Sequence, residues 1–233
     1  MHKLENLKKE LTLLANPGKA NAMQRFFKTG KGEYGYGDKF IGLTVPQQRE
    51  LSIKYKDIEN NDVFTLMKNP IHEFRLTALL IIVLKYKKTD KVGKEKIANL
   101  YLKHTSYINN WDLVDTSAHH ILGDYLLDKP RDIIFKLADS DNLWERRIAV
   151  LTTYAFIRNN DFEDAIKLYT LLLKDKHDLI HKAVGWMLRE AGKRHIEVLT
   201  GFLEEHCIKM PRTMLRYAIE KLPEKTRKKY MAR

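Results

Sequence analysis

The feature that most restricts the fold of this chain is a helical unit that recurs along most of its length. Each copy has a short polar stretch, then an apolar pattern with helical spacing and a bulky apolar side chain in its first turn. Successive side chains of this kind lie 37, 33, 36 and 30 residues apart, at Phe74, Trp111, Trp144, Ile180 and Met210. A second helical segment separates each copy from the next, as in "FEDAIKLYTLLLK". Helix pairs repeated at such intervals are typical of an α-solenoid, so the sequence predicts an all-α protein.

Polar residues that suit helix starts precede two of these units. Asn109 or Asn110 can cap the helix that carries Trp111, and Asn142 with Glu145 fits a capping box. These signals place the helix boundaries close to the apolar markers.

One stretch interrupts the helical pattern. "TGKGEYGYGDKFIG" is rich in glycine, but it lacks the strand and helix that flank a dinucleotide site or a P-loop. We interpret it as a long connection before a helix pair that opens near Val45. Because no composition shift marks a domain boundary, we expect one continuous superhelix over residues 1–233.

The net charge of +12 is the strongest compositional signal. Such an excess indicates a polyanionic partner, usually nucleic acid, although a basic pI kept for solubility is the alternative. Nine Lys or Arg against two Glu fall in Cys207–Arg233, where Arg212 and Arg216 are candidate phosphate contacts. The single cysteine, Cys207, excludes an intramolecular disulfide framework and cysteine-based zinc sites, and it fits a reducing cytoplasm. The apolar run Leu76–Leu84 is too short to span a membrane, and the N-terminus lacks the features of a signal peptide.

The stretch "YINNWDLVDTSAHH" places an indole beside carboxylates. Trp111 and Asp115 are four residues apart, so they are neighbours on a helix surface. Asp112 falls in the first turn, where the helix dipole stabilises a carboxylate, and we interpret it as structural. Asp115 is a turn further on and has no such explanation. Trp186 lies well off the apolar face of its own helix, which indicates either a functional position or packing against the next repeat.

Arg146 and Arg147 occupy the early turns of a helix, where a cation costs about 0.3–1 kcal/mol. A phosphate partner would reverse that sign, and an intramolecular salt bridge is the alternative. His119 and His120 are adjacent and should point to different helix faces, so we expect no metal site. No serine, histidine and acid arrangement for nucleophilic catalysis stands out, and we expect no cofactor.

With these residues in view, the chain resembles the AlkD-type DNA alkylation repair family of DNA glycosylases. The resemblance covers nearly the whole length, and its most specific parts are "NNWDLVD", "DNLWERRIAVL" and "KAVGWMLREAGK". It implies a single domain of HEAT-like repeats, wound as a right-handed superhelix whose concave basic face curves around duplex DNA. We further expect a bacterial cytoplasmic protein that meets DNA at the nucleoid and has no membrane partner. The sequence leaves the oligomeric state open, and a monomer is the default.

The resemblance assigns roles to individual residues. The catalytic aspartate falls on Asp115, and the two tryptophans that hold the damaged nucleotide fall on Trp111 and Trp186. The arginine that supports the DNA backbone at the lesion falls on Arg147, the second of the pair. An aromatic that the family places against the DNA, often tyrosine, aligns with Phe26 and lacks its hydroxyl here.

The implied activity is monofunctional hydrolysis of the N-glycosidic bond of 3-methyladenine or 7-methylguanine, without a deep base pocket. Most glycosylases flip the base instead. No lysine stands out as a Schiff-base nucleophile. The alternative from another class is a non-catalytic solenoid that binds DNA or protein, which would not need Asp115. An RNA-binding scaffold is a weaker alternative, because single-strand recognition usually displays several stacking aromatics on an open platform.

Overall fold

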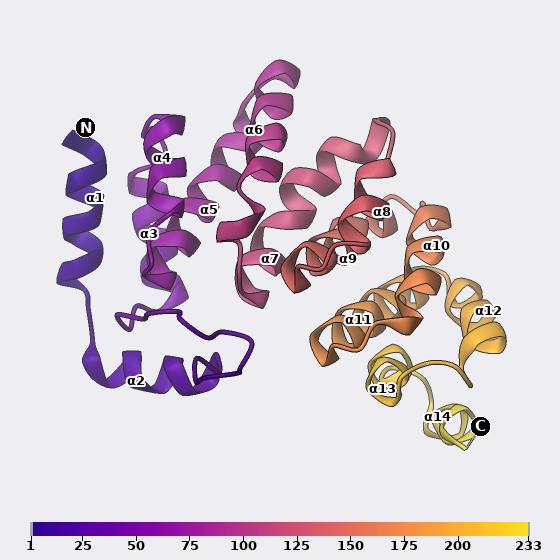
Figure 1. Ribbon diagram of the computed structural model, residues 1–233. Coiled ribbons are helices and arrows are strands. Elements are labelled where there is room, and N and C mark those ends of the chain that lie inside the picture. Colours follow the sequence, from indigo (N-terminus) through magenta and orange to yellow (C-terminus); the bar gives the residue numbers. More distant parts are fainter. Residues whose placement is uncertain (1, 233) are drawn as a thin grey trace. The chain divides into compact units, whose positions relative to one another are not determined.

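The structure is a computed structural model that describes residues 2–232. Every named element of this part of the chain is a helix (Figure 1), with one isolated parallel bridge between Lys39 and Ile71. The all-α prediction is therefore confirmed. The chain divides into two compact units, Met1–Ser117 and Ala118–Arg233, so the expectation of a single domain over residues 1–233 stays a prediction.

The first unit is built around one buried helix. α5 packs against α3, α4 and α6, and its residues from 72 to 83 are all buried. The apolar run Leu76–Leu84 is thus the centre of a helical core. Within residues 2–232, no helix is long and apolar enough to cross a membrane. The helices of this unit are α1 (His2–Leu13), α2 (Pro17–Phe26), α3 (Val45–Lys54), α4 (Asn60–Met67), α5 (His72–Lys88), α6 (Lys91–Lys103), the 3-10 turn Thr105–Tyr107, and α7 (Trp111–Ala118), whose last residue begins the second unit.

The glycine-rich stretch is the connection between α2 and α3, as predicted, and α5 anchors it. The buried carboxylate of Glu73 accepts hydrogen bonds from the backbone N–H groups of Ile41, Gly42 and Leu43, the shortest of them 2.7 Å from Gly42. The backbone N–H of His72 also donates to the Lys39 carbonyl at 2.8 Å. A buried polar group must find a partner, so these bonds hold a segment without regular structure against the core.

The second unit repeats the helix-pair arrangement. α9 packs against α8, α10 and α11, and α11 packs in turn against α12 and α13. Gly185 lets α11 and α13 pack closely, because a Cβ there would lie 2.4 Å from the Met214 carbonyl oxygen on α13. The elements are a π-helical turn (His119–Gly123), the 3-10 turns Leu126–Asp128 and Leu172–Lys174, and α8 (Asp132–Ala138), α9 (Leu143–Arg158), α10 (Glu163–Leu171), α11 (Asp178–Arg194), α12 (Ile196–His206), α13 (Arg212–Ile219) and α14 (Glu224–Met231).

The capping signals are correct in part. The Asn142 side chain accepts the backbone N–H of Trp144 at 2.9 Å, which caps α9 as predicted. The second half of the expected capping box is wrong, because the Glu145 carboxylate accepts the Ser140 hydroxyl at 2.5 Å instead of turning back to the backbone of Asn142. The Ser140 oxygen takes that backbone N–H itself, at 3.1 Å.

Candidate functional site

The helix that carries the indole and the carboxylates begins at Trp111. The buried side chain of Asn110 accepts the backbone N–H of Trp111 at 2.9 Å, so Asn110 is the asparagine that supports this helix start. Asn109 instead directs its amide toward Asp38, at 3.5 Å.

Trp111 lies against two aromatic rings at the end of α2. Its indole stacks on Phe27 with centroids 5.3 Å apart and meets Phe26 edge-on at 6.0 Å. Phe27 is buried, whereas Phe26 is 65% exposed and Trp111 is half-buried. Phe26 and Trp111, both predicted site residues, therefore form one aromatic surface in the first unit. The buried ring of Phe27 packs beneath them.

Asp115 is half-buried, one turn beyond Trp111 on α7. Its negative charge acts on the buried hydroxyl of Tyr101, which lies 2.9 Å from the Ser117 hydroxyl. Burial is the main cause of the raised pKa of Tyr101, and the negative charge of Asp115 adds to it. α7 thus carries an indole and a carboxylate on neighbouring turns, next to a phenol that stays protonated.

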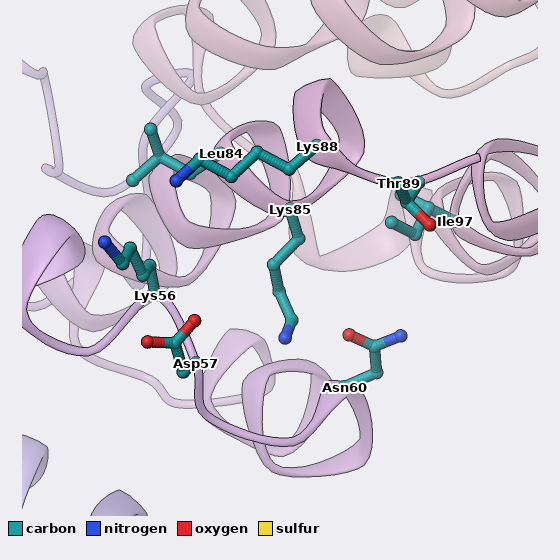
Figure 2. Close-up of a pocket in the computed structure, with 8 residues that line it drawn as sticks. All are labelled: Lys56, Asp57, Asn60, Leu84, Lys85, Lys88, Thr89 and Ile97. Carbon is teal, nitrogen blue, oxygen red and sulfur yellow. The ribbon is translucent and has the colours of Figure 1, made fainter.

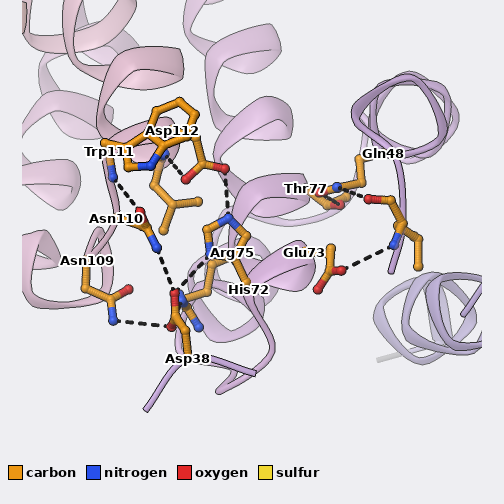
Figure 3. Close-up of polar contacts among 12 residues, drawn as sticks. Asp38, Gln48, His72, Glu73, Arg75, Thr77, Asn109, Asn110, Trp111 and Asp112 are labelled. Carbon is orange, nitrogen blue, oxygen red and sulfur yellow. Dashed lines mark hydrogen bonds and ion pairs between the residues drawn. The ribbon is translucent and has the colours of Figure 1, made fainter. Parts of the chain in front are cut away.

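Asp112 does more than sequence analysis indicates. One of its oxygens accepts the backbone N–H of Leu113 at 2.9 Å, which fits a first-turn carboxylate. The other lies 2.8 Å from Nε2 of His72, a residue of α5 that is only 2% exposed (Figure 3). Asp112 therefore has a structural role, as predicted. It interacts with the imidazole of the buried His72 as well as with the helix dipole.

The opposite nitrogen of His72 meets a second carboxylate. Nδ1 lies 3.1 Å from Asp38, a buried residue of the connection, and Asp38 also accepts from Arg75 and from the Asn110 amide at 3.2 Å (Figure 3). Burial alone would lower the pKa of His72, but Asp112 and then Asp38 outweigh it and raise this pKa to about 9. Burial opposes the charge of Asp38 as well, yet His72 and Arg75 hold the pKa of Asp38 below its usual value.

The two arginines of the second unit have intramolecular partners. Arg146 places Nε 2.7 Å from Asp175, so the salt bridge considered as its alternative is present. Arg147 is only 5% exposed and donates to the Leu179 carbonyl at 2.6 Å. Arg147 therefore ties α9 to the first turn of α11, and its contact with a phosphate stays a prediction.

Trp186 is half-buried on α11, while the apolar face of that helix is buried. Its indole N–H donates to Glu190 at 3.1 Å, and its ring lies 6.3 Å from Tyr154 on α9. The ring of His119 lies 5.3 Å beyond Tyr154. The expectation that His119 and His120 point to different faces is wrong, since their rings lie 3.8 Å apart in a π-helical turn, which departs from α-helical angular spacing.

The remaining candidates lie on α13. Arg212 and Arg216 are exposed, and Arg212 donates to the Met231 carbonyl at 2.7 Å near the end of α14. The candidate residues are thus divided between the units: Phe26, Trp111 and Asp115 belong to the first, and the arginines and Trp186 belong to the second.

Two surface cavities are lined by residues that sequence analysis did not select. One, of about 290 Å³ in the first unit, is cationic, and Figure 2 shows Lys85 directed toward Asp57 and Asn60, with Lys56 and Lys88 nearby. The other, of about 560 Å³ in the second unit, is acidic around Arg131. Within residues 2–232, no group of three or more His, Cys, Asp or Glu side chains is arranged to hold a metal ion.

Repeated helix pairs, with a half-exposed indole and a carboxylate on one helix, define an all-α repeat protein with an aromatic site. The chain belongs to the DNA alkylation repair enzyme family, whose model matches residues 7–222. This membership assigns the protein a role in DNA repair.

Solved structures share this fold at low sequence identity. A predicted DNA alkylation repair enzyme from Enterococcus faecalis superposes with a TM-score of 0.73 at 16% identity, covering 90% of this chain and 97% of the other. AlkD2 from Streptococcus mutans gives 0.56 at 14% identity, covering 88% and 97%. The smu.31 protein of Streptococcus mutans UA159 gives 0.53 at 17% identity, covering 75% and 89%. No curated protein matches the chain.

Proposed function

We propose that this protein is a monofunctional DNA glycosylase that hydrolyses the N-glycosidic bond of cationic alkylated purines, 3-methyladenine and 7-methylguanine, in duplex DNA. The observation that carries the proposal is the surface formed by Phe26 and Trp111, with Asp115 one turn further along α7. The chain belongs to the DNA alkylation repair enzyme family, and its charge of +12 suits a polyanionic substrate.

The chemistry requires stabilisation of a cation more than activation of a leaving group. Alkylation at N3 of adenine or N7 of guanine gives the base a positive charge, so it departs readily as a neutral molecule. As the bond to the base breaks, the deoxyribose gains oxocarbenium character, as sugars do in glycoside hydrolysis. An enzyme for this reaction needs negative potential beside the sugar and a water molecule on the face of the sugar that points away from the departing base.

Asp115 supplies that potential. A carboxylate held in place before the reaction opposes the forming positive charge without reorganising, and it acts more strongly where DNA and aromatic rings exclude water. The same carboxylate positions the attacking water and accepts its proton. Trp111 and Trp186 present the negative faces of their rings to the sugar and hold the nucleotide by contact.

The lesion is engaged from its backbone and is not inserted into a deep base pocket. Phosphates of the duplex are bound by exposed cations, among which Arg212 and Arg216 are candidates, and Arg147 supports the backbone at the lesion. Because charge on the base drives the departure, neutral lesions are poor substrates. The enzyme acts as a monomer and without a cofactor on DNA in the bacterial cytoplasm.

The test is release of the methylated base from treated duplex DNA by the purified protein. We expect 3-methyladenine or 7-methylguanine to appear as free base, and an undamaged duplex to release nothing. A protein that binds duplex DNA and releases no base from any methylated duplex would be the non-catalytic alternative.

A further inference from the structure

The most unusual buried group outside the candidate site is the imidazole of His72. It joins three segments that are far apart in sequence: the α2–α3 connection through Asp38, α5 through His72 itself, and α7 through Asp112 (Figure 3). Both ring nitrogens face a carboxylate, at 3.1 Å and 2.8 Å. Ionised carboxylates only accept hydrogen bonds, and a neutral imidazole has a single N–H, so this geometry is satisfied only by the imidazolium.

The charges of the cluster balance only in that state. Asp38 and Asp112 contribute two negative charges, and Arg75 contributes one positive charge. A protonated His72 makes the cluster neutral, whereas a neutral His72 leaves the partly buried carboxylate of Asp112 without a cation. Unpaired buried charge is strongly unfavourable, so loss of the proton loosens the contacts that hold the first turn of α7.

Two routes connect this cluster to Trp111. The first is the backbone, since Asp112 follows Trp111 directly and Asn110, which accepts the N–H of Trp111, donates its amide to Asp38. The second is a stack of aromatic rings that runs from His72 through Phe40 and Phe27 to Trp111. The centroids of successive rings lie 4.5, 4.9 and 5.3 Å apart. A cation stacked on an aromatic ring is stabilised by the ring, which favours the same charged state.

We propose that His72 is a positioning residue whose imidazolium, held between Asp38 and Asp112, fixes the first turn of α7 and with it the orientation of Trp111. The proposal rests on the proposed function only for its catalytic consequence, which is that excision requires the charged form of His72. His72 touches no substrate and acts through Trp111 and, a turn further on, through Asp115.

The pH range in which this contact acts follows from the groups around the ring. Asp112 faces it from α7, Asp38 faces it from the connection, and Arg75 lies on its own helix and shares Asp38. Against the effect of burial, the two carboxylates raise the pKa of His72 to about 9. The contact is therefore intact at neutral pH and is lost as the pH rises through this value.

Asp112→Asn is the sharpest variant, because it removes a charge and preserves the shape. The Asn oxygen still accepts the N–H of Leu113, and its amide can donate to Nε2 of a neutral imidazole whose Nδ1–H remains on Asp38. The pKa of His72 should then fall by about one unit or more, since its largest raising influence is gone. His104→Gln is the matched control, because His104 is a half-buried histidine of the same unit that contacts neither carboxylate.

The experiment follows the indole N–H signal of Trp111 by NMR in ¹⁵N-tryptophan-labelled full-length protein, together with the imidazole signals, as pH is raised. We expect the Trp111 signal to move with the titration of His72 near pH 9 in the wild type and the His104 variant, and at lower pH in Asp112→Asn. The alkaline limb of single-turnover excision should move by the same amount. The proposal is overturned if the Trp111 signal does not change as His72 titrates. It is also overturned if the alkaline limb of the pH dependence of excision lies at the same pH in Asp112→Asn as in the wild type. A wild type that excises nothing refutes the proposed function, while the Trp111 signal still tests the role of His72.

Discussion

Replacing His72 by glutamine should change how the stability of the protein depends on pH. In the folded protein the pKa of His72 is raised from its ordinary value of 6.5 to about 9 by Asp112 and Asp38, against the effect of burial. The folded state therefore binds the proton more tightly than the unfolded state does. This stabilisation is fully present below about pH 6.5, declines above it and is lost as the pH rises through about 9. A difference of about 2.5 pH units, at about 1.36 kcal/mol each, corresponds to about 3 kcal/mol.

The assay is urea-induced unfolding of the wild type and His72→Gln at several pH values between 6 and 9.5, followed by circular dichroism. The free energy of unfolding of the wild type should fall by about 3 kcal/mol more than that of the variant across this range. The subtraction removes the contributions of groups that titrate alike in both proteins. Parallel pH profiles for the two proteins would contradict the reasoning, because they would show that His72 binds its proton equally in both states.

Three further predictions concern packing and DNA contacts. Gly185→Ala places a methyl group against the Met214 carbonyl oxygen, so it should lower the free energy of unfolding by about 1–3 kcal/mol in the same urea assay. An unchanged free energy of unfolding would show that α11 and α13 can move apart at no cost. Duplex affinity measured by fluorescence anisotropy should fall log-linearly with salt if phosphates are neutralised, whereas a flat dependence between low and physiological salt would contradict binding through phosphates. Arg147→Ala should weaken capture of lesion DNA by about 1.5–3 kcal/mol and Arg146→Ala should weaken it less, since the family resemblance assigns only Arg147 to the DNA backbone at the lesion. Equal binding by both variants and the wild type would refute the role of Arg147.

Local chemistry made part of this structure predictable from sequence. The helix start at Trp111, the cap at Asn142 and the position of Trp186 off its apolar face all follow from spacing and side-chain type within a few residues. The connection between α2 and α3 was also predicted, because glycine-rich sequence disfavours a helix.

Contacts between distant segments were not predictable in the same way. His72 is 34 residues from Asp38 and 40 from Asp112, and no periodicity links a histidine at a helix start to carboxylates so far away. The first-turn position of Asp112 predicts only an interaction with the helix dipole, and it gives no sign of the ion pair with the buried His72. Phe27 was missed for a related reason, since adjacent phenylalanines give no sign of which ring is buried.

The directions of the His119 and His120 side chains are set by the type of helical turn that the backbone forms after α7. An α-helix separates neighbouring side chains by about 100°, and that spacing predicted different faces for His119 and His120. The chain instead forms a π-helical turn there, which ends at a buried glycine, Gly123. A Cβ on Gly123 would lie 2.6 Å from the Thr152 carbonyl oxygen. Close packing on α9 accompanies this turn, and no pattern in the sequence specifies it.

If the negative charge of Asp115 drives excision, Asp115→Asn should remove most of the activity. Asparagine keeps the shape and removes the charge, so the loss of electrostatic stabilisation should cost about 3–4 kcal/mol, or about a hundredfold or more in rate. The control is Asp139→Asn, which neutralises an exposed carboxylate after α8 and should leave the rate unchanged. The measurement is single-turnover release of 3-methyladenine from methylated duplex, so that product release does not mask the chemistry. We expect Asp115→Asn to bind the duplex like the wild type and to release base at about a hundredth of the rate or less. Undiminished release by Asp115→Asn would show that the charge of Asp115 does not drive excision.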